Sequence, residues 1–257
     1  MSKAVLLIGF GSNKPDNQKA MMDVVTRMNS QMSNVYHAFI GGDEPTIESA
    51  MKRMLENGID DVTVIPFLTA SGEMSMRYIP RHLGIEEDPG VYEVSSPGKM
   101  TVRYSKVIGE NPKVSDIIEG KVSELGIEDD STGIMLITHG SQLRYNSMMA
   151  QAHADRLMSM GHKHVLTAFL DYNEPTIEDC ERFMIGRGAN KIVAVPLLMA
   201  SDDNHNEHIP ESLGIGKNND FGSINIAGKD VDIYLTKPVG TDDGILDIIK
   251  DIVSSSQ

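Results

Sequence analysis

The feature that most constrains this chain is an internal duplication. Residues 44–85 and 174–215 align without a gap at an offset of 130, and 16 of the 42 aligned positions are identical. The opening stretches align as well, VLLIGFGSNKPDN at 5–17 with IMLITHGSQLRYN at 134–146. A fixed-period repeat means that one structural unit occurs twice. We therefore predict two domains, residues 1–128 and 129–257, with the seam in the polar segment 126–133.

Each repeat alternates short apolar runs with longer amphipathic ones. In the second repeat, GIMLIT, HVLTAFL, KIVAVP and VDIYL are expected to be strands of a largely buried sheet. Helices are expected over 146–160, over 175–188 with Pro175 at the first helical position, and over 244–253. This alternation predicts an α/β fold of two Rossmann-like lobes. Each lobe is a mainly parallel sheet with helices on both faces, and the active-site cleft is expected between the lobes.

The composition narrows the function classes. With 257 residues and a formal net charge of -14, the chain lacks the basic face of a nucleic-acid binder and would be repelled by an anionic membrane. No apolar run is long enough to span a bilayer. The single cysteine, Cys180, rules out an intramolecular disulfide and is expected to be buried within a helix. We expect a soluble cytoplasmic protein.

The two repeats differ where chemistry is most readily placed. His139 follows the first strand of the second repeat, whereas Phe10 occupies that position in the first repeat. His205 follows the third strand, so both imidazoles are expected at the same edge of the sheet, where they suit Co, Ni, Fe or Zn. His208 lies three residues further on, and Asp202 and Asp203 are candidates for orienting a ring. A single histidine after a strand is usually structural or solvated, so the pairing carries the hypothesis.

Glu174 has two possible roles. It follows the second strand, so it faces the same edge and can relay protons. It also precedes a helix, where a carboxylate offsets the helix dipole, and its repetition as Glu44 favours this structural role. The remaining histidines have no evident partner in the sequence and are expected on the surface or on helix faces: His37, His82, His153, His162 and His164.

The order of these motifs resembles a known family. HGSQLRYN at 139–146, EPTI at 174–177, AVPLLMA at 194–200, a histidine before Ile209–Pro210 and PVG at 238–240 together resemble the CbiX-type sirohydrochlorin cobaltochelatases and nickelochelatases. These are class II tetrapyrrole chelatases, and the first repeat shows the same frame in a degenerate form. The resemblance implies an ATP-independent enzyme of the lyase class. It would insert a divalent metal into sirohydrochlorin during cobalamin, coenzyme F430 or siroheme biosynthesis.

The resemblance also implies roles for individual residues. His139 and His205 would bind the metal, although the family usually has its second histidine at the position of Asn204 and an aspartate at that of His208. A shift of one residue in the loop would restore His205, and His208 is the alternative ligand. One of the histidines or Glu174 would accept protons. Such a polycarboxylate substrate needs local cations, and the candidates are Arg144 and, in the first repeat, Arg77 and Arg81. Ser141 and Asn146 could also donate hydrogen bonds to the carboxylates, or they cap the following helix.

A chain with two fused repeats needs only one pair of metal-binding histidines. The first repeat can therefore lose its histidine. We expect Co²⁺ as the metal substrate, with Ni²⁺ and Fe²⁺ as alternatives, and no further cofactor. The expected partners are sirohydrochlorin and the metal ion, with no nucleic acid and no membrane, and the chain is expected to be a monomer or homodimer. A non-catalytic metal or tetrapyrrole carrier on the same fold is the alternative function.

Overall fold

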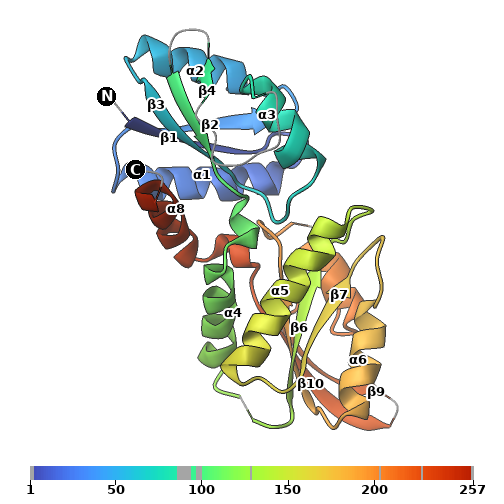
Figure 1. Cartoon of the computed structure of the whole chain (residues 1–257). Helices are drawn as coiled ribbons and strands as arrows, with labels where there is room; N and C mark the ends of the chain where they lie inside the picture. Colours follow the sequence, from blue (N-terminus) through green and yellow to red (C-terminus); the bar gives the residue numbers. More distant parts are fainter. Residues whose placement is uncertain are drawn as a thin grey trace. The chain divides into compact units, whose positions relative to one another are not determined.

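Two α/β units make up the chain in the computed structural model (Figure 1). The structure describes residues 3–85, 94–96, 100–127, 129–202, 204–226 and 228–255. The elements of the first repeat are β1 (Lys3–Phe10), α1 (Pro15–Asn29), β2 (Val35–Ile40), α2 (Ile47–Glu56), β3 (Asp61–Pro66), the π-helical turn η1 (Met74–Tyr78), α3 (Ile79–His82), β4 (Val94–Ser96), β5 (Met100–Tyr104), the 3-10 turn η2 (Ile108–Glu110) and α4 (Lys113–Glu124).

The second repeat follows the same order. Its elements are β6 (Thr132–Thr138), α5 (Arg144–Met160), β7 (Val165–Phe169), α6 (Ile177–Gly186), β8 (Lys191–Pro196), the π-helical turn η3 (Asn204–His208), α7 (Ile209–Ser212), β9 (Phe221–Ile226), β10 (Lys229–Leu235), the 3-10 turn η4 (Val239–Thr241) and α8 (Gly244–Ser255). None of the helices in the described part of the chain combines the length and apolar composition needed to cross a lipid bilayer.

The two sheets have the same strand order, β2-β1-β3-β5-β4 and β7-β6-β8-β10-β9. Four strands of each are parallel, and the predicted mainly parallel sheets are confirmed. The edge strands β4 and β9 are antiparallel to their neighbours and were not predicted. In β9, FGSINI lacks a continuous apolar run because its side chains are only half-buried or exposed.

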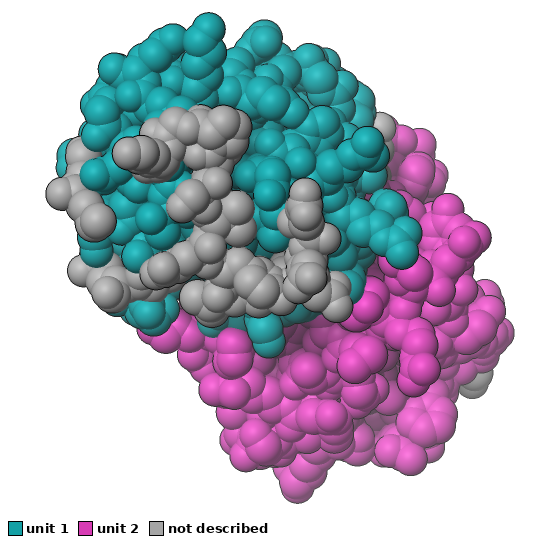
Figure 2. Space-filling view, turned by 45° about the horizontal axis from the view of Figure 1, so that its top comes forward, with its two compact units in different colours: residues 1–111, 243–257 teal, residues 112–242 magenta. Residues whose placement is uncertain are grey.

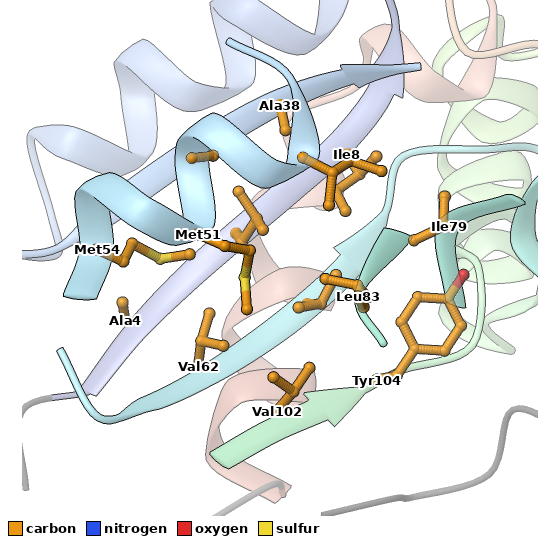
Figure 3. Packing of buried hydrophobic residues seen from close by; sticks show 14 of the residues in the cluster. Ala4, Ile8, Ala38, Met51, Met54, Val62, Ile79, Leu83, Val102 and Tyr104 are labelled. Carbon is orange, nitrogen blue, oxygen red and sulfur yellow. The ribbon is translucent and has the colours of Figure 1, made fainter. Parts of the chain in front are cut away.

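Side chains of the central strands alternate between two apolar layers. In β1, Ala4, Leu6 and Ile8 pack with residues of α2 and α3 in one buried cluster (Figure 3). The intervening Val5 and Leu7 are also buried, and α1 and α8 cover that second face (Figure 1). The predicted helices on both faces of the sheet are therefore present in this unit.

The two units exchange the last helices of the sequence repeats. Unit 1 contains residues 1–111 and 243–257, and unit 2 contains residues 112–242 (Figure 2). Helix α8, at the end of the second repeat, therefore packs on α1, and α4, at the end of the first repeat, packs on α5. The boundary near residue 128 thus separates the sequence repeats and not the compact units. The chain crosses from one unit to the other after Asn111 and again after Asp242.

Polar contacts accompany the packing of α4 on α5. Ser115 Oγ lies 2.8 Å from Nδ1 of the buried His153, and Glu119 Oε2 lies 2.5 Å from Nε2 of His162. No sequence pattern indicated these two partners, because each belongs to the other sequence repeat. His153 lies on a helix face, as one of the two expected positions, but it is buried.

Two local predictions need correction. Helix α6 begins at Ile177 with Thr176 as its N-cap, so Pro175 lies before the helix and not at its first position. Thr176 and Asp179 form a capping box, which fixes that start. Helix α5 begins at Arg144, so Asn146 lies inside its first turn and does not cap it. Cys180 is buried as expected, and burial raises the pKa of its thiol to about 12.

The helix exchange leads to a paired prediction. Replacing the fully buried Ile249 of α8 by Ala should lower the free energy of unfolding by about 2–5 kcal/mol. Hydrogen exchange should increase in α1, because α8 packs there. The matched change, Ile118→Ala in α4, should instead increase exchange in α5. Faster hydrogen exchange in α5 after Ile249→Ala would contradict the packing of α8 on α1.

A buried carboxylate in α6 has no counterpart in the first repeat. Glu181 is 4% exposed, and its Oε1 atom is buried without a hydrogen bond to any described residue. The matching position in the first repeat is the buried Met51. Burial, helped by repulsion from Glu178, raises the pKa of Glu181 to about 7.

This raised pKa predicts a pH-dependent gain in stability for Glu181→Met. The folded protein binds the proton more tightly than the unfolded chain, so the folded state loses stability as the pH rises from about 4.5 towards 7. The substitution should increase the free energy of unfolding at pH 8 on the order of 2 kcal/mol more than at pH 5. Urea unfolding at both pH values measures this difference. Equal gains at both would contradict it, and the exposed Asp23→Asn, in α1 of unit 1, is the control.

Candidate metal site

Three strand ends of unit 2 meet at one edge of the sheet. β6 pairs in parallel with β7 and β8, with Thr138 opposite Phe169 and Ile137 opposite Pro196. Their carboxyl ends therefore lie side by side. The loops that follow them carry His139, Glu174 and η3, as the sequence predicted.

The loop after β6 is held by hydrogen bonds from its own repeat. The buried Asn146 accepts from the Gly140 N–H at 3.2 Å and donates to Thr138 Oγ1 at 3.1 Å. The Ser141 N–H donates to Asn173 Oδ1 at 2.7 Å. The Asn146 side chain therefore stabilises the loop, and its predicted contact with substrate stays a prediction. The Ser141 hydroxyl accepts from the Leu143 N–H at 3.1 Å, so it supports the same turn.

His139 presents its two ring nitrogens to different surroundings. Its side chain is 44% exposed, yet Nδ1 is buried and makes no hydrogen bond to any described residue. The nearest carboxylate oxygen to Nδ1 is Oδ2 of Asp171, at 3.4 Å. Nε2 is therefore the ring nitrogen that solvent or a metal ion can reach. The ring of Tyr172 lies 6.4 Å from that of His139, centroid to centroid.

Both ring nitrogens of His205 already contact the protein. Nδ1 lies 3.0 Å from Asn206 Oδ1, and Nε2 lies 3.2 Å from the carbonyl oxygen of Thr236, which follows β10. A metal ion would have to displace one of these contacts. Asp202 accepts from the backbone N–H groups of Asn204 and His205, and its predicted role as a ring acceptor stays a prediction. Asp203, the other predicted acceptor, lies outside the described residues.

His208 is the more exposed of the two histidines in η3. Its Nδ1 lies 3.2 Å from Asn204 Oδ1, and its Nε2 makes no hydrogen bond within the described ranges. Among the residues that the structure describes, no three His, Cys, Asp or Glu side chains gather closely enough to hold a metal ion. The ligand roles of His139, His205 and His208 stay predictions, carried on loops at neighbouring strand ends.

The duplicated glutamates differ in their contacts. Glu44 accepts from the Thr46 N–H at 3.2 Å and from Ser49 Oγ at 2.7 Å, which is the expected structural role. In the second repeat Asp179 replaces Ser49 and itself accepts from the Thr176 N–H at 3.4 Å. The exposed Glu174 makes no hydrogen bond to the described part of the chain. Its carboxylate is free to act on a ligand.

The arginines that are predicted to bind the substrate carboxylates lie in different units. Arg144 is exposed at the start of α5 in unit 2. Arg77 belongs to η1 in unit 1, where its NH1 lies 3.5 Å from Glu73 Oε2 and its side chain borders a groove of about 1010 Å³. Their binding to substrate carboxylates stays a prediction.

The sequence interpretation missed Asp171 and Tyr172. Both occupy positions where the first repeat has glycine, Gly41 and Gly42. Gly42 and Tyr172 both adopt positive φ, at 96° and 61°. The shared backbone conformation suits glycine, so the exposed tyrosine is held there against its conformational preference. The sequence signal for them is that two glycines of the first repeat are replaced by an aspartate and a tyrosine in the repeat that carries His139.

Tyr172 gives a test of this strain. A non-glycine residue in the left-handed region costs about 1–2 kcal/mol. Tyr172→Gly should therefore give a free energy of unfolding about 1 kcal/mol higher than that of Tyr172→Ala, which keeps the strain and also lacks the ring. Chemical denaturation measures both values. Equal stabilities would show that position 172 is not strained.

The CbiX family profile matches twice, at residues 4–125 and 133–256. The sirohydrochlorin cobaltochelatase of Methanosarcina acetivorans is 36% identical over 121 residues, which are 47% of this chain and 92% of that protein. The Saccharolobus islandicus enzyme of the same name is 33% identical over 117 residues, 46% of this chain and 89% of its own length. These relatives thus correspond in length to one repeat.

Solved structures match the whole chain. SirB from Bacillus subtilis with Fe³⁺ has a TM-score of 0.77 at 18% identity and covers 100% of this chain and 96% of its own. CbiX, described as the terminal enzyme for siroheme biosynthesis in denitrifying bacteria, has a TM-score of 0.66 at 15% identity and covers 99% of both chains. At these identities the structures support the chelatase fold alone. The two profile matches together span nearly the whole sequence, and the chain belongs to the CbiX family.

Proposed function

We propose that this protein is a sirohydrochlorin chelatase, which inserts a divalent metal into the macrocycle without ATP. The observation that best supports this function is His139, half-exposed at the carboxyl edge of the sheet in a CbiX family member. The sirohydrochlorin cobaltochelatases among its relatives favour Co²⁺ as the metal substrate, with Ni²⁺ and Fe²⁺ as alternatives. No cofactor beyond the metal substrate is proposed.

The reaction needs three operations. The metal ion must lose water, two pyrrole N–H protons must leave the macrocycle, and the ion must move onto the ring nitrogens. His139, together with His205 or His208, would hold the ion while leaving positions open for exchange. Because Glu174 is exposed and unpaired among the described residues, its carboxylate would accept a released proton.

The substrate is a polycarboxylate, whereas the chain has a net charge of -14. Repulsion between distant charges is screened beyond about 8 Å at physiological salt, so local cations decide binding. The exposed Arg144 is the first residue of α5 and lies five residues after His139 in the sequence. It is the candidate in unit 2 for binding a substrate carboxylate, and Arg77 is the candidate in unit 1.

An anaerobic insertion assay tests the proposal. Purified protein is mixed with sirohydrochlorin and Co²⁺, Ni²⁺ or Fe²⁺, and the visible absorption is followed against a protein-free control. We expect a rate above the control for at least Co²⁺, reduced to the control rate by His139→Ala. Phe10→Ala, at the matching position of the first repeat, should retain activity.

The second ligand is assigned by the same assay. His205→Ala should abolish insertion if His205 gives up its contacts to Asn206 and Thr236, and loss in His208→Ala alone would assign His208. If no metal is inserted above the control rate, the enzyme proposal fails. Retained binding of Co²⁺ or macrocycle would then identify the chain as a carrier.

A further inference from the structure

We infer that Asp171 is the positioning residue for His139. Its carboxylate accepts the Nδ1 proton of the ring and thereby presents the Nε2 lone pair to the metal ion. This inference rests on the proposed function only in assigning His139 as the metal ligand.

The geometry around Nδ1 carries the inference. Nδ1 is buried and makes no hydrogen bond within the described part of the chain, so its proton lacks an acceptor there. Asp171 Oδ2 lies 3.4 Å away, and the Asp171 side chain is 61% exposed and can rotate. A small rotation of the carboxylate completes the hydrogen bond. Imidazole ligands generally donate their second N–H to such an acceptor, which fixes the tautomer and the ring orientation.

The backbone fixes the distance between the two loops. The Asp171 N–H donates to the carbonyl oxygen of His139 at 2.8 Å. Gly140 has φ of +90°, and a Cβ atom there would lie 1.9 Å from the Asp171 carbonyl oxygen. Only glycine permits so close an approach. The two loops are therefore built to keep residues 139 and 171 adjacent.

The first repeat indicates which of these contacts the fold requires. Its loops keep the bracing contact, because Asp43 accepts from the N–H and the hydroxyl of Ser12 at 2.6 Å each, as Asn173 accepts from the Ser141 N–H. It lacks the other pair, with Phe10 at the histidine position and Gly41 at that of Asp171. The fold therefore requires the bracing contact and does not require a carboxylate at position 171. Asp171 occurs only where there is a histidine to orient.

The test compares the full-length protein with Asp171→Ala and the conservative Asp171→Glu, and uses Glu178→Gln as the matched loss of an exposed carboxylate. Co²⁺ affinity is measured by calorimetry. The tautomer of His139 is measured by ¹⁵N NMR in the metal-free protein, with His139→Gln to assign the signal. Insertion rates are measured in parallel.

We expect Asp171→Ala to weaken Co²⁺ binding by about 10–100-fold. The wild-type ring should carry its proton on Nδ1, and Asp171→Ala should lose this preference. Asp171→Glu should restore part of both properties, and Glu178→Gln should change neither. Unchanged Co²⁺ affinity and tautomer in a folded Asp171→Ala protein would overturn the inference. If the wild type inserts no metal but Asp171→Ala still weakens Co²⁺ binding, the proposed function fails and the positioning role stands.

Discussion

The candidate site depends on the parallel pairing of β6 with both β7 and β8. This pairing brings three carboxyl ends to one edge of the sheet, so residues far apart in sequence begin their loops side by side. The strands hold this register because β6 is buried along almost its whole length. Hydrogen bonds extend this arrangement into the site. One joins the backbones of His139 and Asp171, and two more join the Asn146 side chain to Gly140 and Thr138.

The duplication explains how one scaffold carries two different loop edges. Both repeats keep the strand order, the π-helical turn after the third strand and the bracing contact between the first two loops. The side chains at the edge have diverged, so the histidine-bearing edge is confined to the second repeat. The exchange of α4 and α8 makes each unit depend on both repeats, since each unit buries a helix that the other repeat supplies.

The sequence was informative where periodicity and duplication set the structure. The repeat, the central parallel strands and the position of His139 after β6 were all predicted from pattern. Contacts that depend on packing were not. The exchange of helices follows from where the chain crosses between units, and the start of α6 from the Thr176–Asp179 capping box. Asp171 escaped notice because no motif marks it. Its proximity to Nδ1 depends on a loop geometry that only the structure gives.

In the proposed mechanism the metal ion binds to the second repeat alone, through Nε2 of His139. The most direct measurement is anomalous diffraction at the cobalt edge from crystals of the protein grown with Co²⁺. We expect a cobalt peak about 2.1 Å from Nε2 of His139, with Asp171 hydrogen-bonded to Nδ1, and no ordered cobalt at Phe10. Cobalt bound in the first repeat, or bound through Nδ1 of His139, would contradict the account.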